Sequence, residues 1–368
     1  MIKLRTAALL AGLATASALS AESAPPAPPV RPVFLPDGTV RVPPFELRPS
    51  AFLSPEALAA QKARAQMPAG LPTMNTDIAA SRRGLEAGMA PQVAAMRRLH
   101  AVDVAETRMG GVRVRVVTPQ GKPADPRRVL INVHGGAFTV CAEACAMLES
   151  VPISALGGFK VITVDYRMAP EARHPAGVED VEKVYRELLR TYRPQQIGLY
   201  GCSAGGALTA QAAAWMPRKG LPQFGAIGIF GAGAVRFGAG DSAYVAGYID
   251  GSFPPPPPPS MPPLDMTRGY FTGTDMDDPI VSPALHPEVT AKFPPTLIIT
   301  GTRAMDMSPA IVTNSALIKA GVPSTLIVGE GMGHCYIYQP NLPEARDAQQ
   351  AIVDFFKAKL SAPPARRR

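Results

Sequence analysis

The residues that most constrain the fold of this chain are Gly201-Cys-Ser-Ala-Gly205, which fit the pattern G-x-S-x-G. The apolar residues 197–200 before them predict a short buried strand, and residues 207–215 after them are rich in helix formers. A sharp turn from a strand into a helix has no room for side chains at its neck, and the two glycines supply that room. Such a turn raises a serine hydroxyl above the sheet. The context therefore predicts that Ser203 is a nucleophile.

A second motif, His134-Gly-Gly-Ala-Phe138, follows the apolar residues 129–133, which predict a strand buried on both faces. Two glycines at this place allow consecutive backbone N–H groups to point into a cleft, where they would stabilise a developing oxyanion. A tight strand-to-helix turn is the structural alternative. We expect His134 to tie this loop by a backbone hydrogen bond rather than to transfer protons.

A third motif, Gly331-Met-Gly-His334, follows the last predicted strand at residues 325–328. A histidine in a glycine-flanked loop after the last strand is where the general base of such a fold belongs. The other four histidines need no more than core or surface roles. The sequence therefore predicts His334 as the base that activates Ser203.

Together with Asp165-Tyr-Arg-Met-Ala-Pro-Glu171, the blocks at 134–138 and 201–206 resemble the marker blocks of the hormone-sensitive-lipase-like family of α/β-hydrolases. Asp278-Pro-Ile-Val-Ser-Pro283 is similar to a further block, and the resemblance covers residues 102–358. It implies an α/β-hydrolase fold with an eight-stranded, mostly parallel sheet, helices on both faces and a cap. It also implies cofactor-free esterase activity on short acyl chains.

The resemblance further implies that the N–H groups of Gly135, Gly136 and Ala204 form the oxyanion hole. Two positions depart from the family pattern. Ala137 replaces a third glycine, although it keeps its own N–H, and Cys202 replaces the usual acidic residue before the nucleophile.

The catalytic acid also departs from the pattern, because related sequences commonly have an aspartate where this chain has Ala304. Asp306 lies two residues later, and a shifted strand-end loop could still present it to the histidine. Glu330, near the end of the last predicted strand, is a second candidate, and the absence of an effective acid is a third interpretation. We predict the triad Ser203, Asp306 and His334, whose chain order suits the fold.

The domain organisation starts with a predicted signal peptide at residues 1–21, where Lys3 and Arg5 precede an apolar segment too short to span a bilayer. A retained interfacial anchor or an ordinary helix is the alternative. Export predicts a periplasmic or extracellular protein, and no later segment has the length and polarity of a membrane span. Residues 22–101 are predicted as a proline-rich linker and N-terminal cap. Residues 102–362 form the hydrolase core, with 234–280 as a second cap segment.

The sequence leaves the roles of several side chains in these domains undecided. Four apolar residues recur at helical spacing and could cover a cleft or pack in the core: Leu85, Met89, Val93 and Met96. The alternating residues 112–117 predict a strand of an edge hairpin on which Arg113 and Arg115 face solvent. Six prolines at 254–259 predict a stiff spacer, with a ligand for an aromatic-grooved partner domain as the alternative.

Composition excludes some functions. The net charge is +8, but no basic stripe is interleaved with aromatic residues, so we expect no nucleic-acid partner. The spacing of potential ligands predicts no metal site. Export permits disulfides. Cys141 and Cys145 nevertheless lie four apart on a predicted helix, and Cys202 and Cys335 each neighbour a catalytic residue. We therefore expect four reduced, buried thiols. Oligomeric state is not predicted.

The predicted function is that of a serine carboxylesterase that hydrolyses short-chain acyl esters of small molecules through an acyl-enzyme. A weakly active or silent hydrolase fold that binds small apolar ligands is the alternative. A lactone or amide hydrolase could use the same triad. A surface-tethered interaction protein, acting through its proline stretches, is a rival from another class.

Overall fold

The computed structural model describes residues 31–66, 77–238, 240–251 and 265–360 of the 368-residue chain. The predicted signal peptide at 1–21 and the proline run at 254–259 lie outside these residues. The chain divides into two units, 1–48 and 49–368. The described part of the first unit holds an antiparallel pair, β1 (Val33–Phe34) and β2 (Val40–Arg41). Among the described helices, none is both long and apolar enough to cross a bilayer.

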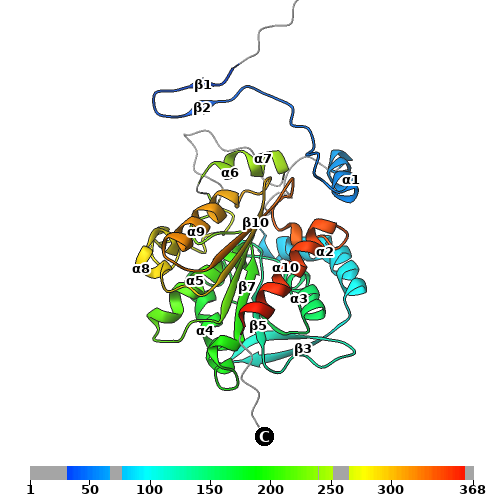
Figure 1. Ribbon diagram of the computed structural model, residues 1–368, viewed down its shortest axis with the longest axis vertical. Helices are drawn as coiled ribbons and strands as arrows, with labels where there is room; N and C mark the ends of the chain where they lie inside the picture. Colours follow the sequence, from blue (N-terminus) through cyan, green and yellow to red (C-terminus); the bar gives the residue numbers. More distant parts are fainter. Residues whose placement is uncertain (1–30, 67–76, 239, 252–264, 361–368) are drawn as a thin grey trace, which may run out of the picture. The chain divides into compact units, whose positions relative to one another are not determined.

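An eight-stranded sheet organises the second unit, in the order β10-β9-β8-β7-β5-β6-β4-β3 (Figure 1). The pairs among β5 to β10 are parallel, whereas β4 runs antiparallel to β6 and to β3. This is the eight-stranded, mostly parallel sheet that the family resemblance implied. The strands are β3 (Val102–Met109), β4 (Val112–Pro119), β5 (Val129–Val133), β6 (Lys160–Val164), β7 (Ile197–Cys202), β8 (Ala226–Phe230), β9 (Thr296–Gly301) and β10 (Ser324–Gly329).

Helices cover both faces of this sheet, as Figure 1 shows. The described helices of the second unit are α1 (Pro55–Ala63), α2 (Ile78–Leu99), α3 (Ala144–Gly157), α4 (Ala176–Leu188), α5 (Ala204–Arg218), α6 (Asp241–Tyr244), α7 (Ala246–Asp250), α8 (Pro287–Thr290), α9 (Met307–Lys319) and α10 (Pro343–Lys359). Residues of α4, α5 and α9 form one buried cluster with the sheet, and residues of α2, α3 and α10 form the other.

The apolar runs of the central strands follow from this two-sided burial. In β5, Ile131 belongs to one cluster and its neighbour Leu130 to the other, and both are fully buried. Successive side chains of a strand point to opposite faces of the sheet. A strand covered by helices on both faces is therefore mostly apolar, as the sequence predicted, and the one polar residue of β5, Asn132, donates to Glu149.

The described N-terminal helices are joined to the hydrolase core. Ser54 caps α1 by accepting the Ala57 N–H, and it donates its own N–H to Glu344 at the start of α10. Gln61 of α1 donates to the carbonyl oxygen of Gly331 at 3.0 Å. The four regularly spaced apolar residues of α2 pack into the cluster around α3 and α10, with Met96 fully buried, so they serve core packing.

One expectation about exposure needs correction, and one residue of the predicted second cap segment lies in the core. Arg113 is exposed, but Arg115 is only 6% exposed. The residues that lead into α3 cover Arg115, which donates to the carbonyl oxygen of Ala142. In the predicted second cap segment, Tyr270 is fully buried against Phe138 with ring centroids 4.6 Å apart, so this part of the segment belongs to the core.

Candidate active site

Ser203 lies at the sharp turn between β7 and α5, with φ 60° and ψ −125°. A non-glycine residue with positive φ is uncommon and is typical of functional turns. A Cβ added at Gly201 or Gly205 would overlap the carbonyl oxygen of Val133, at the end of β5. The two glycines of the motif are therefore required by the close approach of β5 to the turn, as the sequence indicated.

The structure brings Ser203, Asp306 and His334 together at the carboxyl ends of the parallel strands. His334 Nδ1 lies 2.6 Å from Asp306 Oδ1, and His334 Nε2 lies 2.9 Å from Ser203 Oγ. Asp306 is fully buried, whereas the His334 side chain is 17% exposed. With Nδ1–H donating to the carboxylate, Nε2 keeps a lone pair that can accept the serine proton.

The turn after β9 explains how Asp306 reaches the histidine. The Ala304 N–H donates to the carbonyl oxygen of Gly301, and the Met307 N–H donates to the carbonyl oxygen of Ala304. These two backbone hydrogen bonds turn the chain tightly into α9. Asp306 becomes the residue that precedes α9, and its second oxygen accepts the Thr300 hydroxyl at 2.6 Å. Glu330 is exposed, and no hydrogen bond joins it to His334 in the described part of the chain. The geometry therefore favours Asp306 over Glu330 as the candidate acid.

His134 holds the loop of the second motif in place. Its ring is fully buried, stacks on Tyr166 with centroids 4.4 Å apart, and its Nδ1 lies 2.7 Å from the carbonyl oxygen of Gly135. Burial lowers the pKa of His134 to about 4, so the ring is neutral and its Nδ1–H donates to the backbone. The expected backbone hydrogen bond is confirmed.

The predicted oxyanion donors need one correction. The Gly135 N–H donates to Glu149 Oε1 at 3.0 Å, inside the protein, so it is not free to bind an oxyanion. Gly136, Ala137 and Ala204, by contrast, have N–H groups with no acceptor among the described residues. The candidate donors are thus the N–H groups of Gly136, Ala137 and Ala204, because Glu149 accepts the N–H of Gly135.

Glu149 is the residue of this region that sequence reasoning missed. It lies in α3 and is 2% exposed. Its two oxygens accept hydrogen bonds from Asn132 Nδ2 at 2.7 Å, the Gly135 N–H at 3.0 Å, the Cys202 N–H at 3.2 Å and the Tyr338 hydroxyl at 2.5 Å. One carboxyl group therefore joins the oxyanion loop, the nucleophile turn and the segment after His334. The available signal was a single charged residue inside an otherwise uncharged helix.

Burial raises the pKa of Glu149 to about 7 from its ordinary value of 4.5, although its hydrogen bonds, that from Tyr338 first, lower it. Replacing Glu149 by alanine leaves its four buried donors without an acceptor. We expect the free energy of unfolding to fall by about 3–5 kcal/mol. Urea unfolding, monitored by circular dichroism, measures the free energy of unfolding of both proteins. Glu143→Ala, which removes an exposed glutamate just before α3, is the matched control and should change it by about 0.5 kcal/mol or less.

Glu149 makes the stability of the fold decrease as pH rises. Because the folded-state pKa of Glu149 is raised, this group favours the folded state below about pH 4.5, and that contribution is lost as pH rises through about 7. Wild type should therefore lose stability relative to Glu149→Gln between pH 5 and pH 8. If the free energies of unfolding of the two proteins changed in parallel with pH over this range, the raised pKa of Glu149 would be contradicted.

Two disulfides replace the four reduced thiols that we expected. Cys141 is bonded to Cys145 and Cys202 to Cys335. The first prediction was wrong because α3 begins only at Ala144, and Cys141 precedes it with φ 68°. The second was wrong because the strand ends bring together cysteines that are 133 residues apart.

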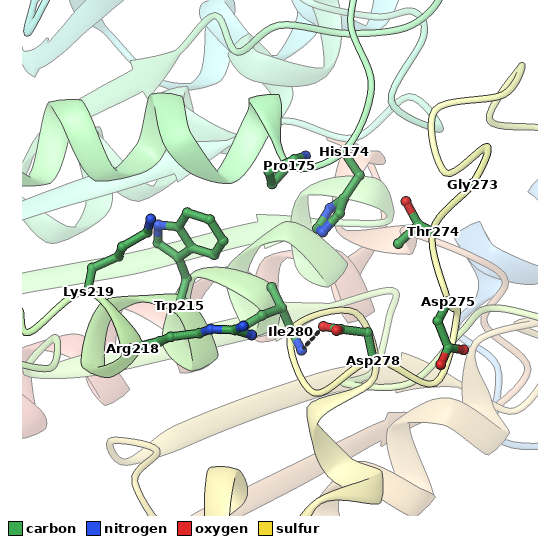
Figure 2. A pocket seen from close by; sticks show the side chains of 10 residues that line it. All are labelled: His174, Pro175, Trp215, Arg218, Lys219, Gly273, Thr274, Asp275, Asp278 and Ile280. Atoms are coloured by element: carbon green, nitrogen blue, oxygen red, sulfur yellow. Dashed lines mark hydrogen bonds between the residues drawn. The ribbon is translucent and has the colours of Figure 1, made fainter.

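A cavity of about 540 Å³ lies away from these residues (Figure 2). Trp215, Arg218 and Lys219, which line it, lie at the end of α5, whereas Ser203 precedes the start of the same helix. Twelve residues of helix separate Trp215 from Ser203 by about 18 Å. Asp278 in its wall accepts the Ile280 N–H at 2.7 Å, so the carboxylate of that sequence block stabilises a turn. In the described parts of the chain, no group of three or more candidate ligands could hold a metal ion.

The described fold and site are those of a serine hydrolase. Residues 130–338 match a family model described as alpha/beta hydrolase fold, and the chain therefore belongs to that family. The resemblance to hormone-sensitive-lipase-like esterases that the sequence motifs indicated is confirmed at this level.

Curated relatives agree with this assignment. An acetyl-hydrolase of Streptomyces hygroscopicus is 30% identical over 232 residues, which cover 62% of this chain and 75% of the relative. The carboxylesterase/phospholipase LipF of Mycobacterium tuberculosis is 27% identical over 236 residues, with 62% of each chain covered.

Solved structures agree as well. The crystal structure of the esterase E25 superposes with a TM-score of 0.74 at 26% identity and covers 87% of this chain and 99% of its own. A crystal structure of an esterase from the bacterial hormone-sensitive lipase family has a similar fold, with a TM-score of 0.70 at 24% identity, and covers 83% of this chain and 97% of its own.

Proposed function

We propose that this protein is a serine carboxylesterase that hydrolyses short-chain acyl esters through an acyl-enzyme. The observation that carries the proposal is the continuous set of hydrogen bonds from Asp306 through His334 to Ser203. A buried carboxylate, an imidazole and a serine hydroxyl in this order are the groups that nucleophilic acyl transfer needs.

In the proposed mechanism, His334 Nε2 takes the proton of Ser203 as Oγ attacks the ester carbonyl carbon. Asp306 holds the imidazole in the productive tautomer and stabilises its charged form. The N–H groups of Gly136, Ala137 and Ala204 bind the oxyanion of the tetrahedral intermediate, and each such donor contributes about 3 kcal/mol. His334 then protonates the leaving alcohol, and a water molecule repeats the sequence on the acyl-enzyme.

The alternative of a silent hydrolase fold rested on Ala304, where related sequences carry an acid. The 2.6 Å contact between His334 and Asp306 favours an active enzyme, because the carboxylate is present from a position two residues later. Lactone or amide hydrolysis would use the same groups, and the choice among these substrates is part of the test.

The proposed substrate class is tested by turnover of p-nitrophenyl esters from acetate to laurate, together with a lactone and an anilide. A named acetyl-hydrolase among the relatives supports the short acyl end of this series. We expect kcat/KM to be highest for acetate or butyrate and to fall towards laurate. Turnover of none of these substrates by the folded protein would support the silent-hydrolase alternative, and a preference for laurate would contradict the acyl-length proposal.

We also propose that the protein is exported, to the periplasm or beyond, with removal of residues 1–21. Lys3, Arg5 and the apolar segment that follows motivate this proposal. The two disulfides support it, because such bonds persist mainly in oxidising compartments. The intact mass of the protein recovered from a periplasmic fraction tests it, and a chain that still carries residues 1–21 in the cytoplasm would argue against it.

A further inference from the structure

One disulfide lies next to both reacting side chains. Cys202 immediately precedes Ser203, and its bonded partner Cys335 immediately follows His334. Cys335 Sγ lies 3.7 Å from His334 Nε2, the same nitrogen that contacts Ser203 Oγ. The covalent bond therefore joins the two backbone segments that carry the nucleophile and the base.

The surroundings of the bond are closely packed. Cys202 is fully buried and Cys335 is 8% exposed. A Cβ added at Gly231, where φ is +53°, would lie 2.7 Å from Cys335 Sγ, 2.9 Å from Cys202 Sγ and 3.3 Å from His334 Cε1. The Ser203 N–H, in turn, donates to the carbonyl oxygen of Phe230 at 2.8 Å. Gly231, which follows β8, thus lies directly against the disulfide and His334, and Phe230 at the end of β8 holds the backbone of Ser203.

The sheet topology shows why such a connection matters. Ser203 follows β7 near the middle of the sheet, whereas His334 follows the edge strand β10, with β8 and β9 between them. Ser203 and Cys335 both have positive φ, 60° and 50°, a conformation that non-glycine residues rarely adopt without support. Asp306 contacts the imidazole ring of His334. The disulfide, by contrast, fixes the backbone on which that ring is carried.

We propose that the Cys202–Cys335 disulfide is a positioning element of the enzyme, which fixes His334 Nε2 relative to Ser203 Oγ, so that full activity requires the oxidised bond. This inference rests on the proposed esterase function. The two cysteines act through Ser203 and His334 and are positioning residues, since neither sulfur takes part in the reaction.

The first test compares two double variants. Cys202→Ala/Cys335→Ala removes the positioning bond, and Cys141→Ala/Cys145→Ala removes the other disulfide as the matched control. With p-nitrophenyl acetate we expect the first to lower kcat by about 10- to 100-fold, with KM changed by less than about threefold, because a displacement of about 1 Å at the reacting atoms costs about 100-fold. The control should keep kcat within about twofold of wild type. Equal kcat values for the two variants would overturn the proposal.

The second test avoids substitution at the site and covers the case in which the first variant does not fold. The Cys141→Ala/Cys145→Ala protein retains a single disulfide. Tris(2-carboxyethyl)phosphine transfers two electrons to that bond and is converted to its oxide by one water molecule, which also supplies the two protons of the thiols. Activity should fall as two thiols per chain become titratable and return when oxidised glutathione restores the bond. Unchanged kcat with two free thiols would overturn the proposal.

The proposal and the function on which it rests fail in different ways. If the oxidised wild type turns over none of the esters, both are wrong. If wild type is active and the reduced protein is equally active, only the positioning role of the disulfide is wrong. Circular dichroism of the reduced protein distinguishes a misaligned site from general unfolding, since loss of the folded spectrum together with activity would also contradict a specific positioning role.

Discussion

Replacement of Ser203 by alanine is expected to lower kcat for p-nitrophenyl acetate by about 10⁶-fold. The variant lacks the oxygen that forms the acyl-enzyme, and removal of the nucleophile from a triad costs about as much as removal of the whole triad. A residual rate above the uncatalysed reaction should remain, since the N–H groups of Gly136, Ala137 and Ala204 are unchanged. Steady-state kinetics at high enzyme concentration measures both quantities.

The matched control for this substitution is Ser324→Ala. Ser324 is the first residue of β10, and its hydroxyl donates to the side-chain oxygen of Asn314 in α9. We expect its kcat to stay within about twofold of wild type. The Ser203→Ala protein should also fail to react with a fluorophosphonate that labels wild type once per chain. Retention of more than about 1% of wild-type kcat by Ser203→Ala would contradict the assignment of the nucleophile.

Replacement of Asp306 by asparagine is expected to lower kcat by about 10⁴-fold. The amide nitrogen cannot accept a hydrogen bond from His334 Nδ1–H, and a neutral amide does not stabilise the imidazolium that forms during acyl transfer. The shape of the site is kept, because the amide oxygen can still accept the Thr300 hydroxyl. The measurement is kcat at several pH values with the same ester.

Glu330→Gln is the matched control for the acid. Its side chain is exposed, so we expect kcat within about twofold of wild type. A large loss in Glu330→Gln together with little loss in Asp306→Asn would show that the loop rearranges around a different acid. Unchanged turnover in both variants would favour a site without an effective acid.

The features that the sequence predicted well are those with local causes. Gly201 and Gly205 are required by one close contact with the carbonyl oxygen of Val133, and that requirement is visible as a five-residue pattern. The apolar run of β5 is a local pattern too, since burial on both faces makes each of its residues apolar or paired. These patterns predicted the individual strands and placed Ser203 and His334 after strand ends, whereas the eight-stranded, mostly parallel sheet was implied by the family resemblance.

The features that the sequence did not predict depend on distant contacts. The Gly135 N–H cannot bind an oxyanion because it donates to Glu149, a residue of α3. The residues around Gly135 in the sequence give no indication of this contact. The sequence could not decide among Asp306, Glu330 and no acid at all as the partner of His334. The turn after β9 determines which side chain reaches the histidine. The pairing of Cys202 with Cys335 likewise depends on the order of strands in the sheet.

The spacing of the cysteines along the chain has a consequence for assembly. Four cysteines allow three pairings, and in two of these Cys202 would be bonded to Cys141 or Cys145 instead of Cys335. Cys141 and Cys145 are separated by 4 residues and the other pair by 133, so closure of the short loop costs roughly 3 kcal/mol less chain entropy. As the chain emerges from its amino end, the short pair can close before Cys335 is available. That early bond removes both competing thiols, and the last cysteine to appear then has a single partner.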